Sequence, residues 1–352
     1  MTGLRVRAFQ AVFDALDRTG ANARFSGRTR GLGLILTLHH VRPFSGEAFA
    51  PNRLLEVEPG FLDLTLSRAE QLGFEFVTLD EAARRVREGR SERPFLHLTF
   101  DDGYRDVRDL ALPILEKRDA PATLYVASGF ADGETEPWWL SLEEAIRRTN
   151  RIEIDLGQGA ATFACGSTAE KYETWSKLYW ALRSGPEDRL RAAASRLAAE
   201  QGVDARHFVR KLCMGWDELA DVAKHPLVEI GAHTVTHPML AKHPADIARA
   251  EIDDSRSAIE QRLGVRPRHF AYPVGDPSAA GARDYEIAKD LGFETAVTTR
   301  PGHLTASHAD ALHALPRVSL NGHFQNRAAL DALLSGAPFA LMDLAKRVLR
   351  RG

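Results

Sequence analysis

The sequence predicts an α/β fold, a distorted (β/α)7-8 barrel that carries a helical insertion. Three observations predict it. Short apolar segments alternate with amphipathic helical segments over most of the chain. Most of these apolar segments are continuous rather than alternating, as is typical of parallel strands covered by helices. Residues 132–214 break the rhythm with a long run of helical patterns, so we expect an insertion on the barrel rim.

The composition is that of a globular protein and excludes some classes of partner. The chain has 352 residues, enough for one large α/β barrel with an insertion or for two ordinary domains. The net charge of −2 gives no argument for nucleic acid, and we expect no such partner. Two cysteines, Cys165 and Cys213, are too few for a disulfide framework or a Cys-based zinc site.

The N-terminal residues 1–30 predict an amphipathic helix. Its apolar stripe comprises Val6, Phe9, Phe13 and Leu16. The segment has no continuous apolar stretch of the kind found in secretory signals, so we predict a cytoplasmic location. The apolar residues 31–38 are too few to span a bilayer and predict a buried strand, and we expect no transmembrane segment.

The C-terminal residues 323–352 predict helices that end in a basic cluster. This cluster comprises Lys346, Arg347, Arg350 and Arg351. A basic amphipathic end favours peripheral contact with a membrane surface. The alternative is a terminal helix that packs on the body of the protein and leaves its charged face in water.

Eight apolar segments predict the strands of the barrel, which residues 31–131 and 215–322 contribute in two parts. The predicted strands are 32–40, 74–79, 95–100, 122–128, 227–233, 269–273, 295–299 and 315–320. Helical patterns lie between them at 59–73, 80–90, 104–119, 244–264 and 283–292. In barrels of such βα units the chemistry lies at the carboxyl ends of the strands.

The insertion at residues 132–214 combines helical patterns with one short hairpin pattern at 151–165. It carries Trp138, Trp139, Trp175 and Trp180. Flat aromatic rings can stack on sugar faces, so Trp138 and Trp139 are candidate substrate-binding residues. The alternative is that these rings form the small core of the insertion itself.

Polar residues follow several of the predicted strands. The first strand ends at His39 and His40, and the third at Asp101 and Asp102. The fifth strand ends at "HTVTH", residues 233–237. Two histidines and one carboxylate from different strand ends can hold a metal ion and leave positions open for water and substrate. The second carboxylate is then a candidate base for that water.

Two of these segments resemble motifs of a known family. "TFDDG" at residues 99–103 and "HTVTH" at 233–237 are similar to the first two motifs of the polysaccharide deacetylases, the NodB-homology domain of carbohydrate esterase family 4. The setting "VEIGAHTVTHPML" at 228–240 is also similar to a frequent family form. The resemblance covers roughly residues 30–130 and 215–320 and implies a NodB-type barrel.

The resemblance implies roles for the matching residues. Asp101 corresponds to the general base of the family. The metal ligands correspond to Asp102, His233 and His237. The third family motif, Arg-x-Pro-Tyr, corresponds to "AYPV", in which Val274 replaces the Tyr whose backbone N–H serves the oxyanion site. Val274 can still serve, because a backbone donor does not depend on the side chain.

The chain departs from the commoner family form in two motifs. Ala271 stands where the family has the Arg that orients the catalytic Asp. The fourth-motif region, "GFETAVTTRPG" at 292–302, has no Asp to pair with such an Arg. Arg317 on the last predicted strand is a candidate to supply the missing guanidinium to Asp101.

The fifth-motif His, the general acid of the family, is absent from its usual place. A branch of deacetylases acting on β-1,6-linked N-acetylglucosamine polymers takes this acid from an early strand that ends in "YH", and "LTLHHV" is similar to it. His39 is therefore the candidate acid, and its neighbour His40 is expected to point elsewhere. We interpret the remaining histidines of the C-terminal third as surface or structural residues, namely His303, His313 and His323.

The resemblance implies a metal-dependent deacetylase that hydrolyses the N-acetyl group of an amino-sugar oligo- or polysaccharide and releases acetate. A divalent ion is the expected cofactor, Zn²⁺ first, with Co²⁺, Ni²⁺ or Fe²⁺ also suited to these ligands. A cytoplasmic location favours a soluble oligosaccharide or a lipid-linked precursor, and Tyr272 is a candidate contact for it. Two alternatives stay open: a NodB-fold hydrolase of a small cyclic amide or ureide, and a non-catalytic carbohydrate-binding pseudoenzyme.

Overall fold

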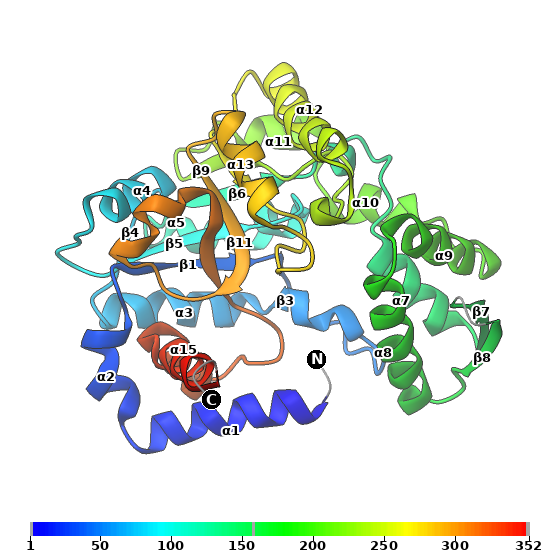
Figure 1. Cartoon of the computed structure of the whole chain (residues 1–352), viewed down its shortest axis with the longest axis horizontal. Helices are drawn as coiled ribbons and strands as arrows, with labels where there is room; N and C mark the ends of the chain where they lie inside the picture. The colour runs from blue at the N-terminus through cyan, green and yellow to red at the C-terminus, as the bar shows by residue number, and fades with distance from the viewer. Residues whose placement is uncertain (1–2, 157–158, 350–352) are drawn as a thin grey trace.

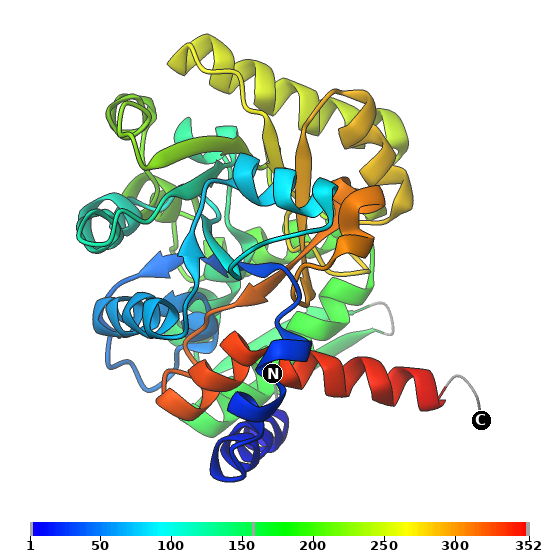
Figure 2. The same ribbon diagram turned by 90° about the vertical axis from the view of Figure 1, so that its left-hand side faces the viewer.

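A closed ring of seven parallel strands forms the centre of the computed structural model, which describes residues 3–156 and 159–349 (Figures 1 and 2). The order around the ring is β1-β12-β11-β10-β9-β6-β5, and the ring closes where β5 pairs with β1. The strands are β1 (Gly33–Leu38), β5 (Phe95–Phe100), β6 (Ala122–Val126), β9 (Val228–Ala232), β10 (His269–Ala271), β11 (Thr295–Pro301) and β12 (Leu315–Ser319). The predicted barrel fold is confirmed, with seven strands in the ring.

All eight predicted strands form, but the second lies outside the ring. β4 (Glu75–Phe76) pairs with the first two residues of β5, whereas β6 pairs with the last three. The other edge of β5 is occupied along its whole length by β1. Just after β1, the short strand β2 (His40–Val41) pairs with β3 (Glu56–Val57) in a separate two-stranded sheet.

Helices surround the ring on its outer side (Figure 2). They are α3 (Pro59–Gln71), α4 (Leu79–Glu88), α5 (Leu112–Glu116), α6 (Ser128–Ala131), α11 (Trp216–Val222), α12 (Ala245–Leu263) and α13 (Ala282–Asp290). Short 3₁₀ segments are η1 (Pro51–Leu55), η3 (Leu240–Lys242) and η4 (Ala306–Ala314). The helix predicted at 104–119 starts instead with a π-helical turn, η2 (Val107–Ala111), before α5, where Pro113 lacks the N–H of a regular helix.

The insertion follows β6 and precedes β9 in the chain, and it lies to one side of the barrel (Figure 1). Its elements are α7 (Trp138–Arg148), β7 (Arg151–Asp155), β8 (Ala160–Ala164), α8 (Thr168–Ser184), α9 (Glu187–Glu200) and α10 (Arg206–Leu212). The strands β7 and β8 form the antiparallel hairpin that the sequence predicts. The helices α7 and α9 pack along each other.

The two ends of the chain form a layer of helices below the barrel in Figure 1. They are α1 (Gly3–Arg18), α2 (Ala21–Thr29), α14 (Arg327–Ser335) and α15 (Ala337–Leu349). The prediction of one helix over residues 1–30 is wrong, because Gly20 adopts a left-handed φ of 67° and separates α1 from α2. The basic residues Arg350 and Arg351 lie outside the described residues.

Within residues 3–156 and 159–349, no single helix is long and apolar enough to cross a membrane. Arg327–Ser335 and Ala337–Ala345 meet the criteria of length and composition only together, as a pair bent by 64°. Most of α14 is buried against the rest of the protein.

Gly231 tests the packing of the barrel. It lies on β9 opposite Tyr125 on β6, and a Cβ at position 231 would stand 2.4 Å from the ring of Tyr125. We expect Gly231→Ala to lower the free energy of unfolding by about 1–3 kcal/mol, because the site would be overpacked. Chemical denaturation measures this, with Gly60→Ala as the control, since open space surrounds Gly60. Equal stabilities of the two variants would contradict the packing argument.

Candidate functional site

Two aspartates and two histidines meet at the carboxyl ends of β5 and β9. Asp101 and Asp102 directly follow β5, and His233 directly follows β9. His237 lies four residues further, in the loop after β9. All four side chains are buried. The structure therefore brings together the residues that the sequence analysis placed at one end of the barrel.

Asp102, His233 and His237 have the spacing of ligands around one metal ion. Oδ1 of Asp102 lies 3.3 Å from Nε2 of His237 and 3.5 Å from Nε2 of His233. Two donors bound at 2.0–2.1 Å to a tetrahedral ion stand about 3.3 Å apart. Oδ1 of Asp102 is buried and accepts no hydrogen bond within the described part of the chain. An orphaned buried carboxylate oxygen between two histidines fits a divalent cation.

The tautomer of His233 also fits a metal ligand. Its Nδ1 lies 2.7 Å from the backbone carbonyl of Ala271 and must donate a proton to that oxygen. The lone pair of the neutral ring is then on Nε2, which faces Asp102. Burial alone would raise the pKa of Asp102, but its contacts with His233 and His237 outweigh burial and hold the pKa well below the usual range. The carboxylate is therefore ionised.

Asp101 is held by a buried arginine. Arg317 on β12 donates from Nη1 and Nη2 to the two carboxylate oxygens of Asp101, both at 2.7 Å. The guanidinium is fixed in turn by the Thr99 hydroxyl and the Thr298 carbonyl, both at 2.9 Å. Burial raises the pKa of Asp101, but the charge of Arg317 outweighs it and the net shift is downward. Arg317 thus occupies the position beside Asp101 for which the sequence analysis named it.

The two histidines after β1 point to different places. His40 donates from Nδ1 to Asp106 at 2.6 Å and stacks on the ring of Tyr104, as expected for a residue that points away from the site. His39 is half-buried, and its pKa is lowered by burial, against which the nearby charges of Asp102 and Asp101 raise it. His39 is therefore near enough to the two carboxylates for their charges to raise its pKa, whereas His40 is held by Asp106.

The backbone at the site is strained, which the sequence pattern did not indicate. Five non-glycine residues of the described chain have positive φ, and four of them either are residues that the sequence analysis assigned to the site or lie between two such residues. They are Asp102 (73°), Thr234 (65°), His237 (58°) and Val274 (62°). Positive φ is most costly for a β-branched residue such as Val274. Strain of this kind persists only where the surroundings hold it in place, and it concentrates at functional sites.

Two elements hold the loop that carries His237. Glu251 on α12 accepts hydrogen bonds from the backbone N–H groups of Val235 and Thr236, at 2.9 and 2.8 Å. From the insertion, Arg191 on α9 donates to the carbonyls of Thr236 and His237, at 3.0 and 2.9 Å. The sequence analysis missed both residues, because neither belongs to a local motif near the loop.

The buried Glu187 completes this clamp from the insertion. It pairs with Arg191 one turn further along α9, and it accepts a hydrogen bond from the N–H of Met239 at 2.7 Å. It also contacts Nε2 of His243 at 3.0 Å. The insertion is thus attached to the loop of His237 through a buried carboxylate and its arginine partner.

The prediction that Tyr272 contacts substrate is wrong. Its side chain is fully buried and its hydroxyl donates to the backbone carbonyl of His313 at 2.9 Å. Its ring packs on Phe270 and Tyr285. Because side chains alternate along a strand, Tyr272 shares the face of Phe270, which is turned to the helix layer and away from the ring interior.

The prediction that Trp138 and Trp139 present a surface for sugar is also wrong. Both rings are buried, and Trp138 packs on Tyr179 within the insertion. Trp139 lies 4.8 Å from the ring of His237, which also stacks on Phe130. The alternative, a core role for these rings, applies to Trp138, whereas Trp139 forms part of the wall behind a candidate metal ligand.

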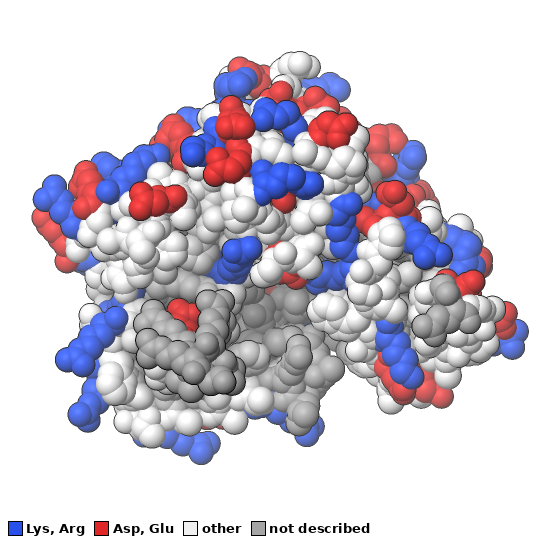
Figure 3. All heavy atoms as spheres, in the orientation of Figure 1, with Lys and Arg blue, Asp and Glu red and all other residues white. Residues whose placement is uncertain are grey.

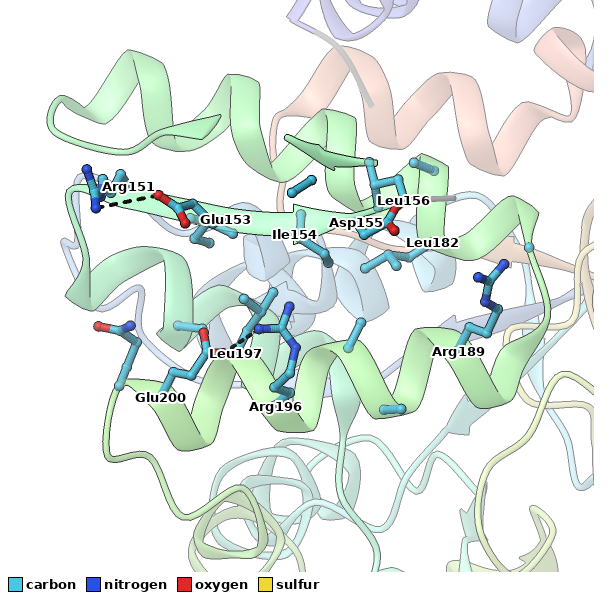
Figure 4. A pocket seen from close by; sticks show the side chains of 18 of the residues that line it. Arg151, Glu153, Ile154, Asp155, Leu156, Leu182, Arg189, Arg196, Leu197 and Glu200 are labelled. Atoms are coloured by element: carbon cyan, nitrogen blue, oxygen red, sulfur yellow. Dashed lines mark hydrogen bonds and ion pairs between the residues drawn. The ribbon is translucent and has the colours of Figure 1, made fainter. Parts of the chain in front are cut away.

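The main groove of the insertion is separate from this site. It has a volume of about 760 Å³ and lies between β7 and α9 (Figure 4). Ile154 points into it from β7, and Arg189 and Arg196 point into it from α9. These arginines lie on the side of α9 opposite Arg191, since residues two or five positions apart fall on opposite faces of a helix. The groove therefore does not open onto the two aspartates.

Comparisons with known proteins agree with this geometry. A family model described as polysaccharide deacetylase matches residues 88–296, more than half of the chain. A comparison with curated proteins gave no match. The matched range contains both aspartates and both histidines but neither His39 nor Arg317.

Three solved structures share the fold of this chain. The Streptococcus pyogenes deacetylase PplD, in complex with acetate, aligns with a TM-score of 0.56 and 20% identity, over 86% of this chain and 97% of its own. IcaB from Ammonifex degensii aligns with a TM-score of 0.55 and 18% identity, over 87% of this chain and 98% of its own. A de-N-acetylase from Aggregatibacter actinomycetemcomitans aligns with a TM-score of 0.50 and 14% identity, over 85% of this chain and 98% of its own. At these identities the similarity establishes the fold.

Arg191 tests whether the insertion positions the candidate ligand His237. We expect Arg191→Ala to weaken binding of Zn²⁺ by about 10–100-fold, the usual effect of removing a group that supports a metal ligand. Competition with a chromophoric chelator measures the affinity. Arg196→Ala is the matched control, because it removes the same side chain from the opposite face of the same helix. Equal zinc affinities in the two variants would show that the clamp has no such role.

Proposed function

Since the chain belongs to the polysaccharide deacetylase family, we propose that it is a metal-dependent enzyme that removes N-acetyl groups from an amino-sugar oligo- or polysaccharide and releases acetate. The observation that carries the proposal is the buried triad of Asp102, His233 and His237 beside the ionised Asp101. The similar enzyme PplD was solved with acetate, which is the product that this reaction would give.

The cofactor we propose is Zn²⁺, held by Asp102, His233 and His237. Such an ion, when bound, acts as a Lewis acid that lowers the pKa of a water molecule and polarises a carbonyl oxygen. Two histidines and a carboxylate also suit Co²⁺, Ni²⁺ and Fe²⁺. Metal analysis of the purified protein distinguishes these ions.

Asp101 is the proposed general base, which takes a proton from the water that attacks the acetyl carbon. Its ionised state is required for this step, and Arg317 maintains it in a buried position. Each carboxylate oxygen has a second lone pair, so the two hydrogen bonds from Arg317 leave Asp101 able to accept a proton. The bidentate contact also fixes the plane of the carboxylate.

Val274 and His39 are proposed for two further roles, stabilisation of the oxyanion and protonation of the departing amine. The backbone N–H of Val274 would donate to the oxyanion that forms from the acetyl oxygen, and the costly positive φ of Val274 supports a functional role for this residue. His39 would give a proton to the departing amine. Burial lowers the pKa of His39, and the charges of Asp102 and Asp101 oppose that shift, so the two carboxylates favour the protonated ring that a general acid requires.

The proposed substrate is a polymer or oligomer of N-acetylglucosamine type, in soluble or lipid-linked form. A panel of N-acetylated oligosaccharides assayed for acetate release tests this. Acetate from any of them, proportional to bound metal, supports the proposal. Ammonia or ureide products from cyclic amides, or metal binding without any acetate release, would contradict it.

Substitutions at the aspartate pair separate metal binding from base catalysis. We expect Asp102→Ala to lose bound metal, because a ligand is removed. We expect Asp101→Asn to keep the metal and to lower kcat by about 10²–10⁴-fold, the usual contribution of a positioned base. Metal stoichiometry and acetate release, measured on the same samples, check both. Full turnover by Asp101→Asn would refute the assignment of the base.

Arg317→Lys tests the proposed orientation of Asp101. Lysine keeps the positive charge but cannot make the paired contact of a guanidinium. We expect kcat to fall at least about tenfold with metal content unchanged, because the carboxylate plane is no longer fixed. The control is Arg256→Lys, which alters another buried arginine whose hydrogen-bond partners, Leu291 and Gly292, are backbone carbonyls. An unchanged kcat in Arg317→Lys would show that Arg317 does not orient Asp101 for catalysis.

A further inference from the structure

The helices formed by the two chain ends carry a charge opposite to that of the rest of the protein. Residues 1–30 and 327–352 contain eleven Lys and Arg but only four Asp and Glu, a net charge of +7. The whole chain has a net charge of −2, so the remaining residues carry −9. In Figure 3, Lys and Arg atoms stand over α2 and along α1 at the lower left and lower edge, whereas both signs mix over the upper part.

Four arginines of α1 and α2 have no acidic partner within the described part of the chain. Arg7, Arg18, Arg24 and Arg28 are exposed, and within the described residues none of them forms an ion pair. By contrast, exposed arginines of the barrel helices are commonly paired, as Arg84 is with Glu81 and Glu88. The positive charge of α1 and α2 is therefore not neutralised within the described protein.

Exposed apolar side chains accompany these charges. Phe9 and Val12 on α1, Phe25 on α2, and Leu341 and Leu344 on α15 are 38–59% exposed. They are five of the eleven large exposed apolar residues in the described chain, although the two terminal segments make up about a sixth of it. On α2, Phe25 follows Arg24 directly and Arg28 comes three residues later in the chain. All three side chains fall within an arc of 100° around the helix.

We propose that this terminal helical module, made of α1, α2, α14 and α15, binds the surface of an anionic lipid bilayer. Unpaired arginines around exposed aromatic and aliphatic residues are the features by which a helix lies in the headgroup region of such a bilayer. The inference does not depend on the deacetylase reaction, since none of these residues belongs to the candidate site. It commits to peripheral binding, and α14 stays packed on the barrel.

The attachment of the module to the barrel supports binding as a unit. Asp331 on α14 accepts two hydrogen bonds from Arg68 on α3, at 2.6 and 3.1 Å. His303, in the loop after β11, contacts the carbonyls of Arg30 and Leu333 at the ends of α2 and α14, at 3.0 and 2.9 Å. Within the described residues, the side chains of Arg7, Phe9, Arg24 and Phe25 on α1 and α2 stay exposed.

Co-sedimentation of the full chain with lipid vesicles tests the proposal. We expect binding to vesicles of phosphatidylcholine mixed with phosphatidylglycerol, and none to phosphatidylcholine alone. Raising the salt from about 0.1 M to about 1 M should release the protein, because the Debye length falls from about 10 to about 3 Å. The double variant Arg24→Glu/Arg28→Glu should bind at least about 25-fold more weakly, since each basic residue contributes about fivefold. Phe25→Ser should weaken binding several-fold.

Matched controls are available on the barrel and the insertion. Arg87→Glu/Arg189→Glu makes the same change of charge at exposed arginines that have no ion pair in the described chain, and Ile247→Ser removes an exposed apolar side chain elsewhere. Both should bind like the unaltered protein. Acetate release from a soluble oligosaccharide should be the same in all variants, which reports on folding.

Several results would overturn the proposal. Equal binding to the two kinds of vesicle, or none to either, would do so without any variant. If Arg87→Glu/Arg189→Glu lost as much vesicle binding as Arg24→Glu/Arg28→Glu, the effect would come from the net charge of the protein and not from the terminal helices. Light scattering without lipid would detect a dimer. A dimer that Phe25→Ser or Leu344→Ser converts to monomers would show that a second copy of the chain covers these residues.

Discussion

The buried ion pair between Asp101 and Arg317 is the interaction on which the site depends. A carboxylate taken out of water loses several kcal/mol of solvation and tends to become neutral unless a partner compensates. The partner here is 216 residues away in the chain and comes from β12, while Asp101 follows β5. Both strands are direct neighbours of β1, which pairs with β12 on one edge and with β5 on the other. Closure of the ring is therefore a condition for an ionised Asp101.

The metal-binding half of the site depends on a second set of constraints. The loop from His233 to His237 contains two residues with positive φ, which costs of order 1–3 kcal/mol each. Two of its backbone N–H groups donate to Glu251, and two of its carbonyls accept from Arg191. The insertion thus belongs to the architecture of the site, because it fixes the backbone at His237 and places Trp139 against the ring of this residue.

The sequence predicted those parts of the structure that local pattern determines. The strands were recognisable because most of them are continuous apolar segments, and Asp101, Asp102 and His233 because they stand at the carboxyl ends of such segments. Tyr272 was misassigned because position after a strand does not say which face a side chain takes. Arg191 and Glu251 were missed because their partners are backbone atoms 45 and 15 residues away, which no motif records. Arg317 was found only because two other residues of the family pattern were absent.

The terminal helices connect the two proposals physically. His303 ties the ends of α2 and α14 to the loop after β11, and β11 is a direct neighbour of β12, which carries Arg317. A bilayer bound by α1 and α2 would therefore hold the barrel at a fixed height and orientation, since only Arg30, Gly31 and Leu32 lie between α2 and β1. A substrate anchored in the same bilayer would then diffuse in two dimensions to a site whose distance from the lipid is set by the fold. On this argument, membrane binding favours lipid-linked saccharides over free oligosaccharides of the same chemistry, although the four central residues would treat both alike.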